Sequence, residues 1–379
     1  MSDLQPAANG AKPRVLQRES NFELLRIIAM LMIVLHHFAY HGKFQFPEEG
    51  ATLNQLWTQF ILVGGKVGVD IFVLISGYFL ILSKSVRTAK AIRLWGQIFF
   101  YSVGFFAVFM IAGKEVPDFN NVLKHVLPLT YRLWWFASSY FLLYLLSPYL
   151  NILLHSLSKQ QYIGLILLMT VFWSLIPTLT AQKFLSNDLL WFVTLYAIGG
   201  YIRIFGTSSK LSAAPLILLS LGIMVLIFLT APALDKLSAR YEFITMKSNY
   251  FYDMQRIPVL IASLLMFLGF SKIHMRTSKF INVISSATFG VYLIHEHDYV
   301  RPFLWKTLFR NASFSESKYL IPYTFLVLAI VYAGCTLIEL IRIYVLEKPC
   351  IPFYQKIGNW LETKCKAKLF RSILHQKES

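Results

Sequence analysis

Long apolar runs alternate with short polar segments along most of this chain. A helix of about 20 apolar residues is long enough to cross the hydrocarbon core of a bilayer. The pattern therefore predicts an all-α integral membrane protein, folded as a bundle of about ten transmembrane helices. The expected spans lie near residues 22–41, 60–82, 94–112, 133–154, 162–181, 189–206, 211–232, 257–271, 281–297 and 320–346.

The composition supports this fold class and places most of the chain in the membrane. The 379 residues are 56% hydrophobic and 15% charged, whereas soluble domains carry about 25% charged residues. We expect an N-terminal cytoplasmic tail over 1–21, a transmembrane domain over 22–347 and a basic cytoplasmic tail over 348–379. Residues 1–20 lack an apolar core with a small-residue cleavage site, so the first span is expected to serve as an uncleaved signal.

The distribution of charge separates this chain from nucleic-acid-binding proteins, although its net charge is +17. Lys and Arg gather in alternate loops, as the positive-inside rule requires when the N-terminus is cytoplasmic. An even number of crossings then places both termini in the cytoplasm, with the protein in the plasma (inner) membrane. The basic C-terminal tail suits contact with anionic lipid headgroups. We therefore expect membrane lipids as partners and no nucleic acid.

The sequence carries no signature of a common metal or nucleotide site. Cys335, Cys350 and Cys365 lie in the last span or the C-terminal tail and do not have metal-ligand spacing. A disulfide is not expected on the reducing side of the membrane. Neither a P-loop nor a dinucleotide-binding fingerprint occurs. We expect no metal.

The first span carries polar residues that a simple membrane anchor would not need, namely Glu23, Arg26, His36 and His37. An Arg at the membrane centre costs roughly 2.5–3.5 kcal/mol on insertion scales. Arg26 and His37 are eleven positions apart, about three helical turns, so they share one side of the helix with roughly 16 Å of rise between them. This stripe presents a guanidinium near one membrane face and an imidazole toward the other. A site that reaches across a membrane could be built in this way.

The second span adds a pair of charges and a pair of small residues. Lys66 and Asp70 are four positions apart and can pair on one helix face, either as a structural ion pair or as part of a site. Ser76 and Gly77 follow nearer the cytoplasmic end. Small residues there allow close helix approach or leave room for a ligand.

Two further pairs of charged residues have i, i+3 spacing. Lys90 and Arg93 project together from the start of the third span. A basic cluster opening onto an intramembrane cavity would hold phosphate groups, although any cytoplasmic segment of a membrane protein tends to be basic. Glu339 and Arg342 lie near the cytoplasmic end of the last span and are expected to form a structural pair.

Aromatic and imidazole side chains mark the opposite membrane face. Trp135 lies at the start of the fourth span, where an aromatic belt would also explain it. Tyr292 and His295 lie on the ninth span, and His295 is expected at its outside end. The level of His295 in the bilayer matches that of the two histidines of the first span. This match favours a functional role over that of a lone interfacial histidine.

Taken together, these stretches resemble the membrane-bound acyltransferase-3 family, which O-acylates cell-surface carbohydrates. Arg26 and His37 match the family's signature of an arginine and a histidine separated by ten residues. The Ser76-Gly77 step with the aromatic residue after it, the aromatic and Pro-containing fourth span, and the Y-L-x-H sequence that ends at His295 are also similar. The likeness runs from about residue 20 to residue 347.

The chain differs from the family pattern in two respects. The family often has an arginine pair after its second span, where this chain has Lys90 and Arg93. Members that modify peptidoglycan often carry a C-terminal extracytoplasmic hydrolase-like domain, which this sequence does not show. The resemblance is therefore to a stand-alone form, in which the transmembrane part completes the transfer.

The resemblance implies transfer of an acyl group, expected to be acetyl from acetyl-CoA, to a hydroxyl of an envelope polysaccharide or a lipid-linked sugar. His37 is the candidate general base, because imidazole titrates near physiological pH. Arg26 would bind or orient the thioester donor. The candidate donor-binding residues are Lys90, Arg93, Ser76 and Gly77, and the candidate acceptor-binding residues are His36, Trp135, Tyr292 and His295.

A secondary transporter or a lipid-linked-sugar flippase is the alternative from another class. The intramembrane Arg, His, Lys and Asp residues would then form a proton relay or a substrate path. Inverted repeats would favour that interpretation, and the sequence shows none. A purely structural membrane protein is disfavoured by the charged stripe on the first span.

Overall fold

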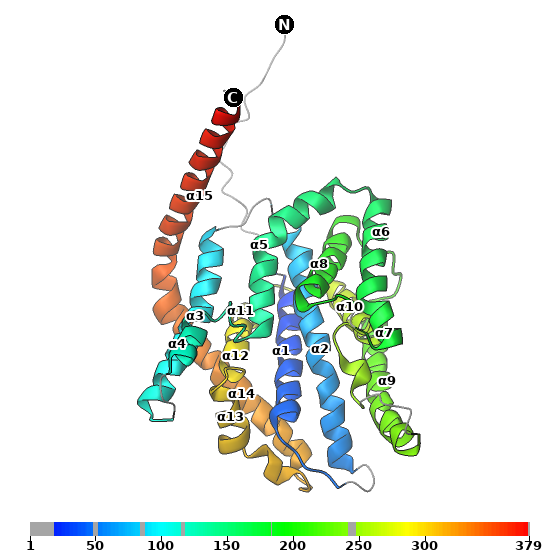
Figure 1. Ribbon diagram of the computed structural model, residues 1–379. Helices are drawn as coiled ribbons and strands as arrows, with labels where there is room; N and C mark the ends of the chain where they lie inside the picture. The colour runs from blue at the N-terminus through cyan, green and yellow to red at the C-terminus, as the bar shows by residue number, and fades with distance from the viewer. Residues whose placement is uncertain are drawn as a thin grey trace.

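The structure is a computed structural model that describes residues 19–47, 52–83, 88–114, 118–182, 184–241 and 248–377. It is 80% helical, and no strand occurs among these residues. The expected all-α membrane bundle is therefore confirmed (Figure 1). Most of the predicted N-terminal tail over 1–21 lies outside the described residues.

Within the described ranges, nine helical segments are long and apolar enough to cross a membrane. Six of them are single helices or nearly so: α1 (Ser20–His41), α2 (Leu53–Leu80), α3 (Thr88–Ile111), α5 (Trp135–Ser156), α8 (Asp188–Phe205) and α9 (Ala213–Arg240). The other three are composite: α6 (Lys159–Thr170) with η1 (Val171–Leu175) and α7 (Ile176–Thr180); η2 (Tyr250–Tyr252) with α10 (Ile257–Ser271); and α14 (Leu320–Ile341) with η5 (Arg342–Glu347) and α15 (Lys348–Lys377). The short elements are α4 (Phe119–Val126), α13 (Val300–Pro302), η3 (Phe303–Leu308) and η4 (Asn311–Phe314).

The span expected at 281–297 is not one continuous helix. It consists of α11 (Lys279–Ser286) and α12 (Thr288–His295), each eight residues long. The Thr288 hydroxyl donates to the Ser285 carbonyl at 2.9 Å, and the Ala287 amide donates to the Ile284 carbonyl at 3.0 Å. Side-chain hydroxyls that hydrogen-bond to nearby carbonyls compete with regular helical bonding, which accounts for the break.

Glycines let the central helices approach each other closely. A Cβ at Gly68 of α2 would lie 2.6 Å from the carbonyl oxygen of Ala29 in α1. A Cβ at Gly77 would overlap the Tyr196 carbonyl oxygen of α8, and one at Gly199 of α8 would overlap the Leu74 carbonyl oxygen of α2. The absence of side chains at these positions allows backbone-to-backbone packing, as is common between membrane helices.

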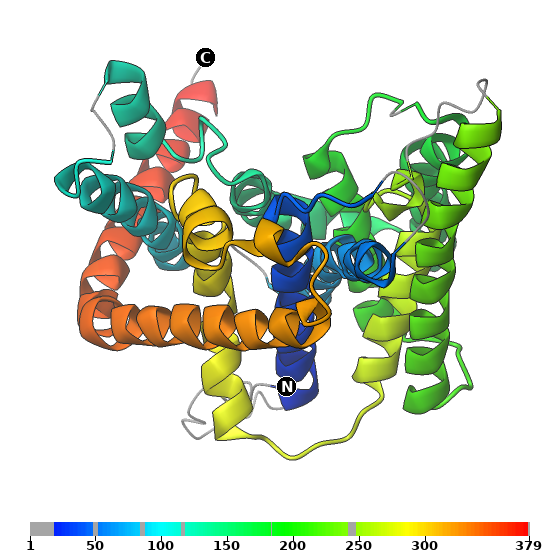
Figure 2. The same cartoon turned by 90° about the horizontal axis from the view of Figure 1, so that it is seen from below.

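The C-terminal helices border the bundle. In the view of Figure 2, α14 (orange) runs across α12 and α1, which it contacts, and α15 continues from its end at a steep angle. Residues 348–377 of the predicted basic tail are thus helical. The expected pair is present, because Arg342 Nε lies 2.8 Å from Glu339 Oε2 with both side chains buried. Helix α15 packs on the start of α3, where the Glu362 carboxylate accepts from the Thr88 amide at 3.1 Å.

Candidate active site

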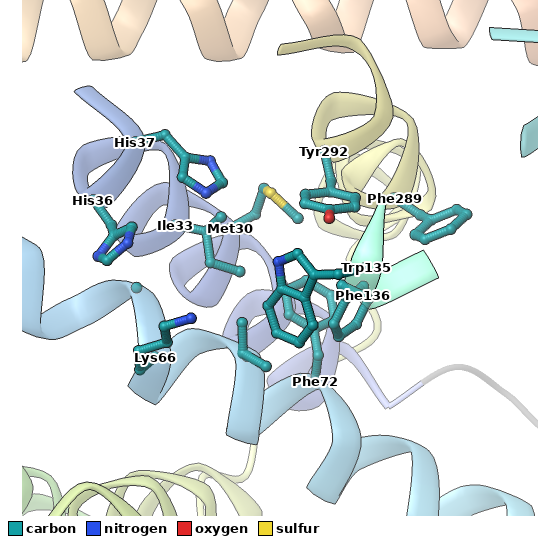
Figure 3. A pocket seen from close by; sticks show the side chains of 12 residues that line it. Met30, Ile33, His36, His37, Lys66, Phe72, Trp135, Phe136, Phe289 and Tyr292 are labelled. Atoms are coloured by element: carbon teal, nitrogen blue, oxygen red, sulfur yellow. The ribbon is translucent and has the colours of Figure 1, made fainter. Parts of the chain in front are cut away.

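Two neighbouring cavities lie along α1. We call the first the histidine cavity, because His36 and His37 line it (Figure 3). It has a volume of about 40 Å³. Its lining comes mainly from the second half of α1, the middle of α2, the start of α5 and α12: Met30, Ile33, His36, His37, Gly65, Lys66, Val69, Phe72, Trp135, Phe136, Phe289 and Tyr292.

The second, which we call the basic cavity, has a volume of about 320 Å³. It is formed by the first turns of α1 and α3, the end of α2, the middle of α5 and the junction of α11 with α12. Its lining residues are Glu23, Arg26, Phe72, Ser76, Lys90, Arg93, Leu94, Gln97, Phe136, Tyr140, Tyr144, Ser285, Ser286, Thr288 and Phe289.

Three phenylalanines line both cavities, namely Phe72 of α2, Phe136 of α5 and Phe289 of α12. The Phe72 and Phe136 ring centroids are 6.4 Å apart. We call these three residues the aromatic collar. Because both cavities share the collar, they are neighbours, with Arg26, Lys90 and Arg93 on one side of it and Lys66 and the two histidines on the other.

The hydrogen bonds of His37 define which of its ring nitrogens is basic. His295 Nδ1 lies 2.6 Å from the Val291 carbonyl oxygen. A carbonyl only accepts, so this nitrogen carries the hydrogen and Nε2 of a neutral His295 is an acceptor. His37 Nδ1 lies 2.8 Å from His295 Nε2 and therefore donates to it. This network leaves His37 Nε2 as the nitrogen with a free lone pair.

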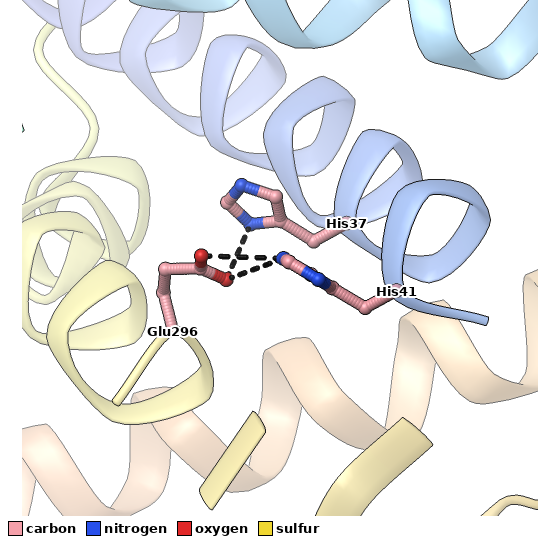
Figure 4. Close-up of side chains that lie close together, drawn as sticks. All are labelled: His37, His41 and Glu296. Atoms are coloured by element: carbon pink, nitrogen blue, oxygen red, sulfur yellow. Dashed lines mark hydrogen bonds and ion pairs between the residues drawn. The ribbon is translucent and has the colours of Figure 1, made fainter. Parts of the chain in front are cut away.

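Glu296, at the end of α12, brings the polar residues of this region together (Figure 4). Its Oε2 lies 3.4 Å from His37 Nδ1 and 3.2 Å from His41 Nε2. Its Oε1 accepts from Arg301 Nη1 at 3.0 Å, and the carboxylate side chain is only 11% exposed. Figure 4 shows the second ring nitrogen of His37 directed away from the carboxylate. Glu296 is thus placed to hold the His37 ring and to stabilise it when it is protonated.

The same group has the donor atoms of a metal site. One ligand-type atom from each of His37, His41 and Glu296 lies within 4.8 Å of the others. Arg301 and both imidazoles already share the Glu296 carboxylate. This positive guanidinium opposes a cation at that carboxylate, so the contacts describe an ion-pair cluster rather than a cage of free ligands.

Arg26 is held inside the basic cavity by Glu23 of α1, which is itself held by Ser285 of α11. Arg26 Nη1 lies 2.5 Å from Glu23 Oε1. The Glu23 carboxylate also accepts from the Ser285 hydroxyl at 2.5 Å, and Glu23 is 7% exposed. A buried carboxylate with two donors holds the guanidinium in one orientation at the cavity wall.

The other predicted donor-binding residues occupy two different settings. Lys90, Arg93 and Ser76 all line the basic cavity. Lys90 Nζ lies 5.3 Å from the Tyr144 ring centroid, and Arg93 Nε lies 3.5 Å from Glu347 Oε1. The Ser76 hydroxyl donates to the Phe72 carbonyl at 2.8 Å. Gly77 lines neither cavity and packs against the α8 backbone.

The predicted acceptor-binding residues gather around His37, with one difference from expectation. His36, Trp135 and Tyr292 line the histidine cavity. His295 was expected to emerge at the outside end of its span, but it is 0% exposed. It lies behind His37 and contacts that ring, not the cavity.

The expected pairing of Lys66 with Asp70 does not form. Lys66 Nζ lies 4.9 Å from the Trp135 ring centroid in the histidine cavity. Asp70 accepts from Trp191 Nε1 at 3.0 Å on the α8 side of the helix. The two side chains contact different neighbours, because Trp135 of α5 lies beside Lys66 and Trp191 of α8 lies beside Asp70.

Sequence reasoning missed His41 and Glu296. Signals for both were present, since His41 lies one helical turn after His37 and Glu296 directly follows His295. Their meeting depends on the packing of α12 against α1, across more than 250 residues of chain. No pattern within one helix predicts the contact of Glu296 with the histidines of α1.

The fold and the two cavities define a class, a polytopic membrane protein with two neighbouring cavities lined by cations and imidazoles. The sequence profile of the acyltransferase-3 family, described as an acyltransferase domain, matches residues 19–340. No curated protein and no solved structure matches the chain. The chain belongs to the acyltransferase-3 family and is a membrane acyltransferase.

Proposed function

We propose that this acyltransferase moves acetyl from cytosolic acetyl-CoA to a hydroxyl of an envelope polysaccharide or a lipid-linked sugar. One observation carries the proposal: the basic cavity and the histidine cavity meet at the aromatic collar. In this proposal α11 and α12 together make the tenth crossing, so both termini are cytoplasmic, in the plasma membrane, as the distribution of Lys and Arg supports. The basic cavity then faces the side that supplies acetyl-CoA, and the histidine cavity faces the acceptor.

The basic cavity suits the donor because its cations match the phosphates of CoA. Lys90 and Arg93 come from the first turns of α3, and Arg26 comes from α1. Guanidinium groups bind phosphate oxygens through two parallel hydrogen bonds, and an ammonium binds them as a point charge. The slender arm of CoA, and not its bulky nucleotide, has to pass the collar toward His37.

The chemistry follows from the free nitrogen of His37. A sugar hydroxyl is a weak nucleophile until a base removes its proton. His37 Nε2 takes that proton while the hydroxyl oxygen attacks the thioester carbonyl carbon. The tetrahedral intermediate then expels the CoA thiolate, which receives the proton from His37. Glu296 acts as a positioning residue, since it faces Nδ1 and not the reacting atoms. The reaction written in this way uses no metal ion.

The test is transfer by the purified protein in lipid nanodiscs. Acetyl-CoA with a radiolabelled acetyl group is incubated with candidate envelope oligosaccharides and lipid-linked sugars, and the label on the glycan is counted. We expect label on the glycan and one CoA thiol released for each acetyl transferred. Movement of a lipid-linked sugar across the bilayer without acetylation would identify a flippase instead.

A further inference from the structure

Lys66 is the cation that the proposed reaction does not use. It lies in the span Leu53–Leu80 and lines the histidine cavity beside the two histidines (Figure 3). A lysine within a span is costly and marks a functional site more often than an anchor. Its ammonium rests on the Trp135 ring at 4.9 Å from the centroid, a contact that compensates only in part for lost hydration.

No carboxylate of the described residues forms an ion pair with Lys66 within 4.0 Å. The described lining of its cavity consists of apolar, aromatic, glycine and histidine residues. Asp70, one turn along α2, accepts from Trp191 Nε1 of α8 and lies outside ion-pair distance of Lys66. The cavity therefore presents a positive charge that no carboxylate of the described residues pairs with at ion-pair distance.

Specific packing contacts of His36 fix the surroundings of Lys66. Gly65 has no side chain, and a Cβ there would overlap the His36 ring, so His36 packs directly against α2 next to Lys66. His36 Nδ1 lies 2.7 Å from the Leu62 carbonyl oxygen and so donates to it. The His36 ring stacks on Tyr40 at 5.6 Å between centroids, and Tyr40 is 63% exposed. His36 therefore lies between the exposed Tyr40 ring and the part of α2 that carries Lys66.

We infer that Lys66 forms an anion subsite in the histidine cavity, and that the acceptor carries a carboxylate or a phosphate close to the hydroxyl that is acylated. The inference rests on the proposed function for the identity of this cavity as the acceptor side. The Trp135 ring lines the same cavity and offers an aromatic surface for a sugar. The ammonium selects the sugars that carry an oxyanion.

A different use of the same charge would be to stabilise the oxyanion of the tetrahedral intermediate. That role predicts that Lys66 raises the rate for every acceptor, charged or neutral. An anion subsite predicts an effect on the KM of anionic acceptors alone. The two roles therefore separate in a comparison of matched acceptors.

The experiment compares wild-type protein with Lys66→Gln and Lys66→Arg. Two acceptors are anionic: a uronic-acid oligosaccharide, and an oligosaccharide of neutral sugars that carries one phosphate. The third is the neutral, carboxyl-reduced counterpart of the first. Binding to the protein without donor is measured first, and KM and kcat of acetyl transfer are measured separately. Lys159→Gln is the matched control, because Lys159 also lies over an aromatic ring, that of Phe205, but lines neither cavity.

We expect wild-type protein to bind one of the two anionic acceptors at least tenfold more tightly than the neutral one. Lys66→Gln should abolish that preference, Lys66→Arg should retain it, and Lys159→Gln should not change it. Comparison of the uronic-acid acceptor with the phosphorylated acceptor identifies whether a carboxylate or a phosphate is preferred. No preference in the wild-type protein, or an equal loss of kcat on all acceptors in Lys66→Gln, would overturn the inference. Because binding is measured without donor, absence of acetyl transfer would count against the proposed function alone.

Discussion

Two adjacent histidines of α1 have different surroundings, although both line the same cavity. His36 donates to the Leu62 carbonyl and packs over Gly65. His37 is held through Nδ1 by His295 and Glu296. One imidazole is thus tied to the α2 backbone, and the other is oriented by side chains that can respond to its protonation.

The first prediction follows from this difference. His37→Ala should lower the rate of acetyl transfer by roughly 10²–10⁴-fold, the usual cost of losing a general base. The variant should still insert into the membrane and still bind acetyl-CoA. His36→Ala should be clearly milder. Both variants are assayed for single-turnover transfer, and equal tolerance of the two substitutions would move the base elsewhere.

Glu296→Gln tests the positioning role. A hydrogen bond to a charged group contributes about 1.5–3 kcal/mol, which corresponds to roughly 10- to 100-fold in rate. We expect a loss of this size in kcat, smaller than that of His37→Ala, with donor binding unchanged. Asp188→Asn is the control, because Asp188 pairs with Arg132 away from both cavities. A kcat equal to that of the wild type would show that His37 does not need the carboxylate.

At the scale of elements, the break between α11 and α12 shapes the basic cavity. Ser285, Ser286 and Thr288 of this junction line that cavity, and the Ser285 hydroxyl reaches Glu23. A continuous helix would keep the Ser285 carbonyl in the regular bonding pattern, whereas here the Thr288 hydroxyl bonds to it. The break therefore coincides with the residues that hold Arg26 through Glu23.

The start of α3 carries the prediction about the donor. The double variant Lys90→Ala, Arg93→Ala should raise the KM for acetyl-CoA with little change in kcat. Charge-assisted phosphate contacts are strong when buried, but Arg93 is 44% exposed and solvent screens it, so we expect roughly a tenfold effect. Isothermal titration with CoA measures the change in donor affinity, and steady-state assays measure the change in KM. Arg132→Ala, on an exposed residue outside both cavities, should leave the affinity unchanged.

The contact between α2 and α8 yields a prediction about stability. Gly77→Ala places a Cβ against the Tyr196 backbone, which neither helix can move away from alone. Overpacking of this kind costs about 1–3 kcal/mol, so thermal stability in nanodiscs should fall. Gly222→Ala on α9 has open space around the added Cβ and should be neutral. If Gly77 contacts the donor instead, Gly77→Ala will raise the KM for acetyl-CoA without lowering the melting temperature.

The sequence predicted the elements better than their contacts. Hydrophobic runs located the spans, and i, i+3 spacing located the Glu339–Arg342 pair, because both depend on neighbours along one helix. Arg26 and His37, eleven residues apart, line the two neighbouring cavities along α1. Lys66, however, turned to Trp135 and not to Asp70, and Glu296 reached α1 from another helix. Contacts that depend on which helices pack together have no local signature.

At the scale of the whole molecule, the expected topology can be tested with single cysteines in a cysteine-free background. Residues 10 and 274 should react with a membrane-impermeant maleimide only after the cells are opened, and residue 43 should react in intact cells. His274 and Lys43 are both exposed in loops at the two ends of the bundle, so labelling reports the side of the membrane. Labelling of residues 10 and 43 on the same side would contradict the assignment.

The aromatic collar has a consequence for the cell as well as for the reaction. Neighbouring cavities inside a membrane protein form a potential leak for protons and salts, which would discharge the membrane potential. Three phenylalanines shared by both cavities make the boundary between them apolar, and apolar constrictions exclude water and the ions it carries. A neutral acyl thioester can enter such a boundary, whereas a hydrated ion cannot. The collar would thus let the acyl group across while the membrane stays electrically sealed.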